Sequence, residues 1–109
     1  METFIKQVEV MNTDGAGRIS PLFIPMIIGN ICAGNIAIRF NAQGPCLPVT
    51  SACSTSTHAI GEAFRAIKHG YADAIIAGGA EAAINPLAIG GFANIRALST
   101  TEDPTEACR

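Results

Sequence analysis

The segment 55–69 constrains the fold most strongly, because its apolar residues recur at helical spacing on one face while charged residues occupy the other. The apolar positions are Ala59, Ile60, Ala63, Phe64 and Ile67. Gly70 predicts the end of this helix. A short strand is predicted before it, at 46–50, and a buried strand after it, at 73–77. Strand, helix and strand in this order predict a βαβ unit, with a right-handed crossover between parallel strands, and hence an α/β fold class.

The remaining segments show weaker patterns. Residues 11–19 are rich in Gly, Asn and Asp and are predicted to form a loop. A helix is predicted to begin at Pro25, with apolar residues at helical spacing. Those residues are Ile28, Ile31, Cys32 and Ile36. Gly29 and Gly34 lie inside this helix and predict that another backbone approaches it closely. A short helix is predicted over 87–95.

The chain is unusually apolar and carries little charge. Of its 109 residues, 49% are hydrophobic and 15% are charged, against about 25% charged in an ordinary domain. A domain this short needs a polar shell, so the composition indicates a part of something larger. The apolar content excludes intrinsic disorder. A net charge of −2 without basic clusters argues against nucleic-acid binding.

Membrane insertion is the rival explanation for this apolar content. The longest run without a polar residue, 21–29, has nine residues, whereas a membrane span needs about 20. The N-terminus also lacks the basic and apolar stretches of a signal peptide. We therefore expect a cytoplasmic protein that does not bind a membrane.

The four cysteines are Cys32, Cys46, Cys53 and Cys108. Two disulfide bridges would be permitted in a secreted chain, but in a reducing compartment we expect free thiols with mostly structural, buried positions. Their separations of 14, 7 and 55 residues include no CxxC pair. No metal site is therefore predicted.

Cys53 is the one cysteine whose context suits a nucleophile. It lies where the first predicted strand meets the start of the predicted helix, and reactive groups are displayed at the carboxyl ends of such strands. Unpaired N–H groups and the helix dipole favour a thiolate there and could stabilise an oxyanion. The alternative is a plain helix start, in which Ser54 or Thr55 caps the helix and Cys53 packs. Both alternatives stay open on the local pattern alone.

No residue of the chain suits the role of base for Cys53. His58 lies about 140° around a continued helix from Cys53, and His69 lies about 24 Å along it. His58 is predicted to be a surface or packed histidine, so a catalytic histidine would have to come from outside this chain. Asp73 and Glu81 are lone acids without a spaced partner.

Glycine-rich loops can bind phosphate groups. The chain has two glycine pairs, Gly78-Gly79 and Gly90-Gly91. Neither pair fits the dinucleotide-binding or P-loop glycine pattern. Flat packing or a close approach of one backbone to another is the better explanation for both.

Three motifs follow one another along the chain: TSACSTSTHAIG at 50–61, AGGAE at 77–81 and GGFANIRALS at 90–99. In order and spacing they resemble the β-ketoacyl-acyl-carrier-protein synthases, of the synthase II type of bacterial fatty-acid elongation. Residues 19–34 and 44–45 also fit, so the resemblance covers essentially the whole chain.

The resemblance implies a thiolase-like α/β/α/β/α layered fold and a homodimer. It places the nucleophile on Cys53, which would accept an acyl group from the phosphopantetheine of acyl carrier protein. A carbanion from decarboxylated malonyl-carrier would then attack the thioester and lengthen the acyl chain by two carbons. No cofactor of the protein's own is implied, because the carrier holds the substrate.

The same resemblance implies roles for five other residues. Phe92 falls on an aromatic side chain beside the cysteine in the acyl pocket. Phe23 and Ile24 fall on positions that the partner subunit contributes to the end of that pocket. Arg96 falls on a basic residue that meets the acidic carrier protein, and Arg18 is assigned to the same rim.

The resemblance also implies what the chain lacks. Residues 46–50 resemble a strand that pairs with its two-fold mate across the dimer, an edge-like context that suits Pro48. Residues 1–109 are expected to be a ketosynthase domain incomplete at both ends, because the family's two catalytic histidines and its lysine lie beyond Arg109. The isolated chain is therefore expected to lack condensing activity. A polyketide ketosynthase and a non-catalytic assembly module are the alternatives.

Overall fold

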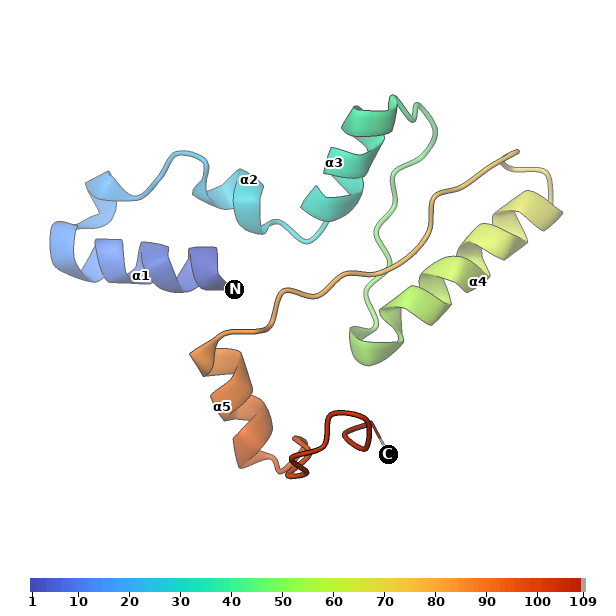
Figure 1. The fold of residues 1–109 in the computed structure, drawn as a ribbon. Coiled ribbons are helices and arrows are strands. Elements are labelled where there is room, and N and C mark those ends of the chain that lie inside the picture. The colour runs from blue at the N-terminus through green and yellow to red at the C-terminus, as the bar shows by residue number, and fades with distance from the viewer. Residues whose placement is uncertain (109) are drawn as a thin grey trace. The chain divides into compact units, whose positions relative to one another are not determined.

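The computed structural model describes residues 1–108, and within them every regular element is helical (Figure 1). The chain divides into two units, Thr3–Glu81 and a second unit that contains Ala82 onwards with Met1–Glu2. The elements are α1 (Glu2–Asp14), η1 (Ala16–Arg18), α2 (Phe23–Ile27), α3 (Ile31–Phe40), η2 (Ala52–Ser54), α4 (Thr55–Lys68) and α5 (Pro86–Asn94), where η1 and η2 are single 3₁₀ turns.

The predicted loop at 11–19 is wrong for its first four residues, because α1 continues to Asp14. Polar side chains on an exposed helix do not break its backbone hydrogen bonds, and the Thr13 hydroxyl donates to the Glu9 carbonyl, 3.0 Å away. The break comes at Gly15, whose φ of +87° suits a residue without a Cβ. The rest of the predicted loop is irregular apart from η1.

The single helix predicted from Pro25 is two helices, α2 and α3. Ile28 separates them with an extended backbone (φ −60°, ψ 139°). Pro25 lies within the first turn of α2 rather than at its first position, and its missing N–H has no intrahelical partner at either place. The predicted close approach at Gly29 and Gly34 is not found, since no described atom would meet a Cβ at either residue within 4 Å.

The prediction for 55–69 is confirmed by α4, which ends one residue earlier. The end is a Schellman motif: the Tyr71 N–H donates to the Ala66 carbonyl at 2.9 Å and the Gly70 N–H to the Ile67 carbonyl at 3.0 Å. Gly70 has a φ of +74°. Gly70 therefore ends the helix, as the sequence predicts.

The short helix predicted over 87–95 is confirmed as α5. The Asn85 side chain caps it by accepting the Ala88 N–H at 3.0 Å, and Pro86 occupies its first position. The other side-chain atom of Asn85, Nδ2, is buried and has no hydrogen-bond partner among residues 1–108.

Neither predicted strand forms among the described residues. Segments 46–50 and 73–77 are irregular and are drawn as plain tubes in Figure 1. A strand is stabilised by backbone hydrogen bonds to a neighbour, and no backbone hydrogen bond within residues 1–108 joins these segments to each other or to a third. The predicted βαβ unit, and with it the buried strand at 73–77, is therefore absent from the described chain.

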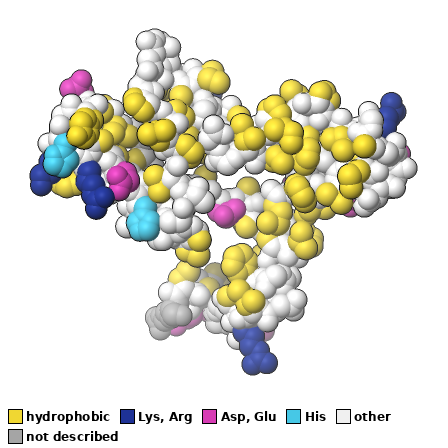
Figure 2. Space-filling view, turned by 180° about the vertical axis from the view of Figure 1, so that it is seen from behind, with side chains coloured by type: hydrophobic (Ala, Val, Ile, Leu, Met, Phe, Trp, Pro, Cys, Tyr) yellow, Lys and Arg dark blue, Asp and Glu magenta, His cyan; other side chains and the backbone are white. Residues whose placement is uncertain are grey.

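No residue among 1–108 is buried. Hydrophobic side chains are spread over the face seen in Figure 2. In α4, Ile60 is 57% exposed and Phe64 is 64% exposed, so the apolar face that defines this helix is left uncovered. No helix within the described part of the chain has the length and apolar character needed to cross a membrane.

Candidate active site around Cys53

Cys53 is exposed and lies in η2, the single turn that leads directly into α4. The residue before it, Ala52, has a φ of +49°, in the left-handed region that residues with a Cβ rarely adopt. Such a conformation costs of the order of 1–2 kcal/mol and persists where neighbouring interactions hold it. The chain therefore makes a sharp, strained turn at Ala52, directly before Cys53.

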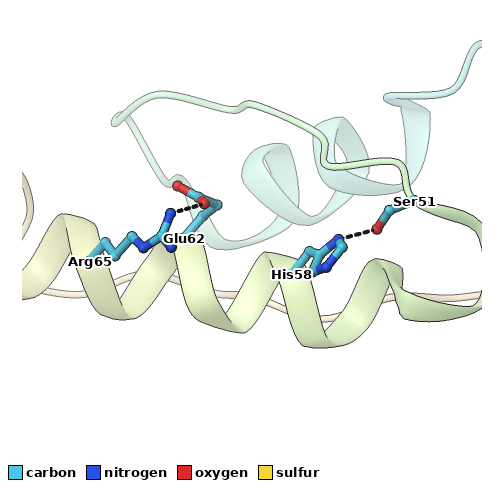
Figure 3. A network of polar contacts seen from close by, with 4 residues as sticks. All are labelled: Ser51, His58, Glu62 and Arg65. Carbon is cyan, nitrogen blue, oxygen red and sulfur yellow. Dashed lines mark hydrogen bonds and ion pairs between the residues drawn. The ribbon is translucent and has the colours of Figure 1, made fainter.

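Ser51 ties both ends of this turn together through each of its polar groups. Its N–H donates to the Thr55 hydroxyl at 2.9 Å, and its carbonyl accepts from the Ser54 hydroxyl at 2.8 Å and from the Ser54 N–H at 3.1 Å. Its own hydroxyl lies 2.6 Å from Nδ1 of His58 (Figure 3). Four hydrogen bonds thus connect the residue before the turn to residues after Cys53.

The capping alternative for this segment is wrong in the structure. Ser54 occupies the N-cap of α4 without a side-chain capping bond, because its hydroxyl donates backwards to Ser51. The Thr55 hydroxyl is likewise engaged by the Ser51 N–H. Cys53 is exposed rather than packed. The thiol therefore lies beside a helix start that neither of these side chains caps, where the helix dipole favours negative charge.

The two histidines are both exposed, as the surface prediction for His58 requires. His58 bonds to Ser51, and His69 packs its ring 6.3 Å from that of Tyr71. No hydrogen bond within residues 1–108 joins either ring to Cys53. The Ser51 to His58 contact was not predicted, because Ser51 precedes the helix and helical spacing says nothing about where its side chain lies.

Gly79 of the second motif lies against the first turn of α4. A Cβ on Gly79 would collide with the Ser56 hydroxyl and lie 3.3 Å from the Ser56 backbone nitrogen. The predicted close approach is therefore confirmed at Gly79. It is not found at Gly78, Gly90 or Gly91, where no described atom would lie within 4 Å of a Cβ.

All four cysteines are free and exposed. The expected burial of the structural thiols is wrong, because the described residues form no core that could enclose them. No group of three or more metal-binding side chains occurs in the described part of the chain.

The family described as "Beta-ketoacyl synthase, N-terminal domain" matches residues 2–109. The chain belongs to this family. The resemblance inferred from the three motifs is thereby confirmed.

Two relatives of this ketoacyl synthase chain are 3-oxoacyl-[acyl-carrier-protein] synthases 2. The protein from Staphylococcus aureus is 45% identical over 109 residues, which are 100% of this chain and 27% of the relative. The protein from Coxiella burnetii (strain RSA 493 / Nine Mile phase I) is 48% identical over 101 residues, 93% of this chain and 24% of the relative. The chain spans about a quarter of the length of these curated relatives.

In the Thr3–Glu81 unit, the structure describes three of the residues that the ketoacyl synthase resemblance implies for substrate and carrier. Phe23 opens α2 and is half-buried, with its ring 5.9 Å from that of Phe4. Ile24 follows it and is 60% exposed. Arg18 ends η1 with an exposed side chain. All three are accessible, and none is hydrogen-bonded to the turn that holds Cys53.

The unit that contains α5 holds the other two. Phe92 lies in α5 and is 44% exposed. Arg96 follows α5, is exposed and has a φ of +56°. Its N–H donates to the Ala93 carbonyl at 2.9 Å, and the Ala97 N–H donates to the Phe92 carbonyl at 3.0 Å, so the chain turns sharply at this arginine.

Proposed function

We propose that this chain is the nucleophile-bearing part of a 3-oxoacyl-acyl-carrier-protein synthase of fatty-acid elongation. The observation that carries the proposal is the position of Cys53, an exposed thiol in a strained turn directly before the uncapped start of α4. Family membership and the printed names of the relatives support it.

The proposed chemistry has two steps at the Cys53 sulfur. The Sγ thiolate attacks the carbonyl of an acyl thioester on acyl carrier protein, and the carrier's thiol leaves, so that the acyl group is held on Cys53. Malonyl-carrier then loses carbon dioxide, and the resulting carbanion attacks the Cys53 thioester. A new carbon–carbon bond forms, the carbon–sulfur bond to Cys53 breaks, and the thiolate is restored. Backbone N–H groups at the start of α4 would stabilise the oxyanions of both attacks.

Five residues have proposed supporting roles in the complete protein. Phe92 would line the acyl pocket, and Phe23 and Ile24 would close the end of the pocket of a partner subunit. Arg96 and Arg18 would meet the acidic carrier protein. Arg18, Ile24, Phe92 and Arg96 are exposed, which supports these roles because such side chains can meet a ligand or another subunit, while Phe23 is half-buried against Phe4.

The proposal extends to the architecture. Residues 1–109 would form part of the N-terminal half of a thiolase-like α/β/α/β/α fold, in which 46–50 and 73–77 become strands once neighbours supply their hydrogen bonds. The complete protein would be a cytoplasmic homodimer, with 46–50 paired to its two-fold mate.

Peptide-resolved mass spectrometry after incubation of the full chain with an acyl-carrier thioester tests this function. We expect slow acylation at Cys53 and none in the Cys53→Ser variant, with Cys46→Ser as the matched control that leaves the label in place. An acyl group found on Cys32 or Cys46 instead would overturn the assignment of the nucleophile.

A second candidate function is a non-catalytic module that assembles through its apolar surface. The exposed apolar face of α4, with Ile60, Phe64 and Ile67, favours it. Native mass spectrometry and binding of a hydrophobic dye separate the two: an assembly module predicts oligomers and strong dye binding. A monodisperse monomer with little dye binding would contradict it.

A further inference from the structure

A side-chain contact between Ser51 and His58 joins the residue before the turn that holds Cys53 to helix α4. The Ser51 hydroxyl lies 2.6 Å from His58 Nδ1. Ser51 precedes the turn and His58 is the fourth residue of α4, so this contact spans both Ala52 and Cys53. Among residues 1–108, it is the one hydrogen bond of Ser51 that reaches beyond the first residue of the helix.

The acidic neighbour of His58 on the helix makes a contact of its own. Glu62 lies one turn further along α4, and its carboxylate pairs with Arg65 at 2.9 Å. Figure 3 shows the two contacts as separate pairs, with His58 directed at Ser51 and Glu62 at Arg65.

The left-handed backbone at Ala52, with a φ of +49°, is rarely adopted by a residue with a Cβ and costs free energy, so interactions on both sides of it help to maintain it. The backbone bonds of Ser51 to Ser54 close the turn locally, and the Ser51 to His58 bond fixes its direction relative to α4.

We propose that the Ser51 to His58 pair positions Cys53 at the start of α4, which makes His58 a positioning residue for the nucleophile. The inference rests on the proposed function of Cys53 as the acyl acceptor. His58 itself does not touch the substrate or remove the proton of the thiol.

The test measures the alkylation rate of Cys53 by iodoacetamide in the full chain, as a ratio to Cys32 in the same molecule. Ser51→Ala and His58→Ala should each lower the ratio about fivefold, the factor that corresponds to one ordinary hydrogen bond. Ser51→Thr keeps the hydroxyl and should restore the ratio. His69→Ala, at the other end of α4, should leave it unchanged.

The double variant and a spectroscopic readout separate positioning from general damage to the fold. Ser51→Ala combined with His58→Ala should be no worse than either single change, because both remove the same bond. In the unmodified chain, ¹⁵N resonances of the His58 ring should show one fixed tautomer, and Ser51→Ala should make them average as in an unbonded ring.

Three results would overturn the proposal: unchanged ratios in both single variants, additive losses in the double variant, or tautomer averaging at His58 in the unmodified chain. The tautomer measurement uses the unmodified chain, so it tests the proposal even where a variant unfolds α4. Iodoacetamide needs neither carrier nor acyl group, so a failure of acylation at Cys53 with the expected alkylation ratios would reject the proposed function and leave the positioning intact.

Discussion

Gly79 lies so close to Ser56 that a Cβ on the glycine would collide with the serine hydroxyl and lie 3.3 Å from its backbone nitrogen. The AGGAE motif therefore contacts the first turn of α4 at Ser56, which lies three residues after Cys53. A glycine is favoured here by contact with a neighbour rather than by its own backbone angles, since its φ is not positive.

Gly79→Ala should therefore loosen the first turn of α4. Overpacking in a core costs about 1–3 kcal/mol, and we expect a cost at or below the lower end here because Gly79 and Ser56 are exposed and the Ser56 hydroxyl can rotate away. Amide hydrogen exchange of residues 55–58 in the full chain would report it. Ser56→Ala removes the hydroxyl and should recover part of the loss. Gly78→Ala is the matched control, because no described atom lies within 4 Å of its added Cβ. Equal effects at Gly78 and Gly79 would contradict the contact.

Gly70→Ala should fray the last turn of α4, because Gly70 holds a φ of +74° in the Schellman motif. We expect a cost of about 1 kcal/mol and a loss of helicity by circular dichroism. Gly61→Ala lies at a mid-helix position with open space around its Cβ. It should instead stabilise α4 by a similar free energy and raise its helicity. A gain of helicity in both variants would show that the Schellman motif does not form.

Asn85→Ala should weaken α5 by about 1 kcal/mol, since it removes the cap on the Ala88 N–H. Asn85→Asp keeps the capping oxygen and replaces the buried, unpartnered Nδ2, so it should preserve or raise the protection of α5 amides. Asn30→Ala is the control, because Asn30 occupies the N-cap of α3 without a capping bond. If the Asn30 and Asn85 alanine variants lost equal protection in their own helices, the cap at Asn85 would be refuted.

Asp103 should titrate below its ordinary pKa of 3.8, because its carboxylate accepts hydrogen bonds from the Thr105 hydroxyl and then from the Thr105 N–H. A lowered pKa means that the turn is fully stabilised above pH 3.8 and loses this stabilisation as the pH falls through the lowered value. Thr105→Val should raise the pKa in a ¹³C carboxyl titration. Thr101→Val should not, since the Thr101 hydroxyl bonds the Asp103 N–H and not its carboxylate.

The parts of this chain that could be predicted are those whose signals are local. The apolar spacing of α4, the glycine at its end and the Asn85-Pro86 start of α5 each act within one or two turns. The segments 46–50 and 73–77 have the composition of strands, but a strand needs a partner, and the described residues provide none. No helix was predicted before residue 11, and the predicted loop at 11–19 begins four residues too early, because Gly15 and not the polar residues before it stops α1.

The candidate site divides in the same way. The position of Cys53 directly before a helix could be predicted, because the start of that helix is visible in the sequence. The left-handed Ala52 and the bond from Ser51 to His58 could not, since both depend on how the chain turns before α4 begins. Ser54 and Thr55 looked like capping residues but turn back to Ser51, a choice that residue preference does not reveal.

The contact between Gly79 and Ser56 also has a consequence for the order of events during synthesis. Ser56 leaves the ribosome 23 residues before Gly79, and α4, whose hydrogen bonds are all short-range, can form as soon as it emerges. The turn that holds Cys53 then forms first, and its contact with the glycine motif forms later, once Gly79 has been synthesised. A nascent chain halted between these two residues would carry Cys53 next to a helix that does not yet have its contact with Gly79.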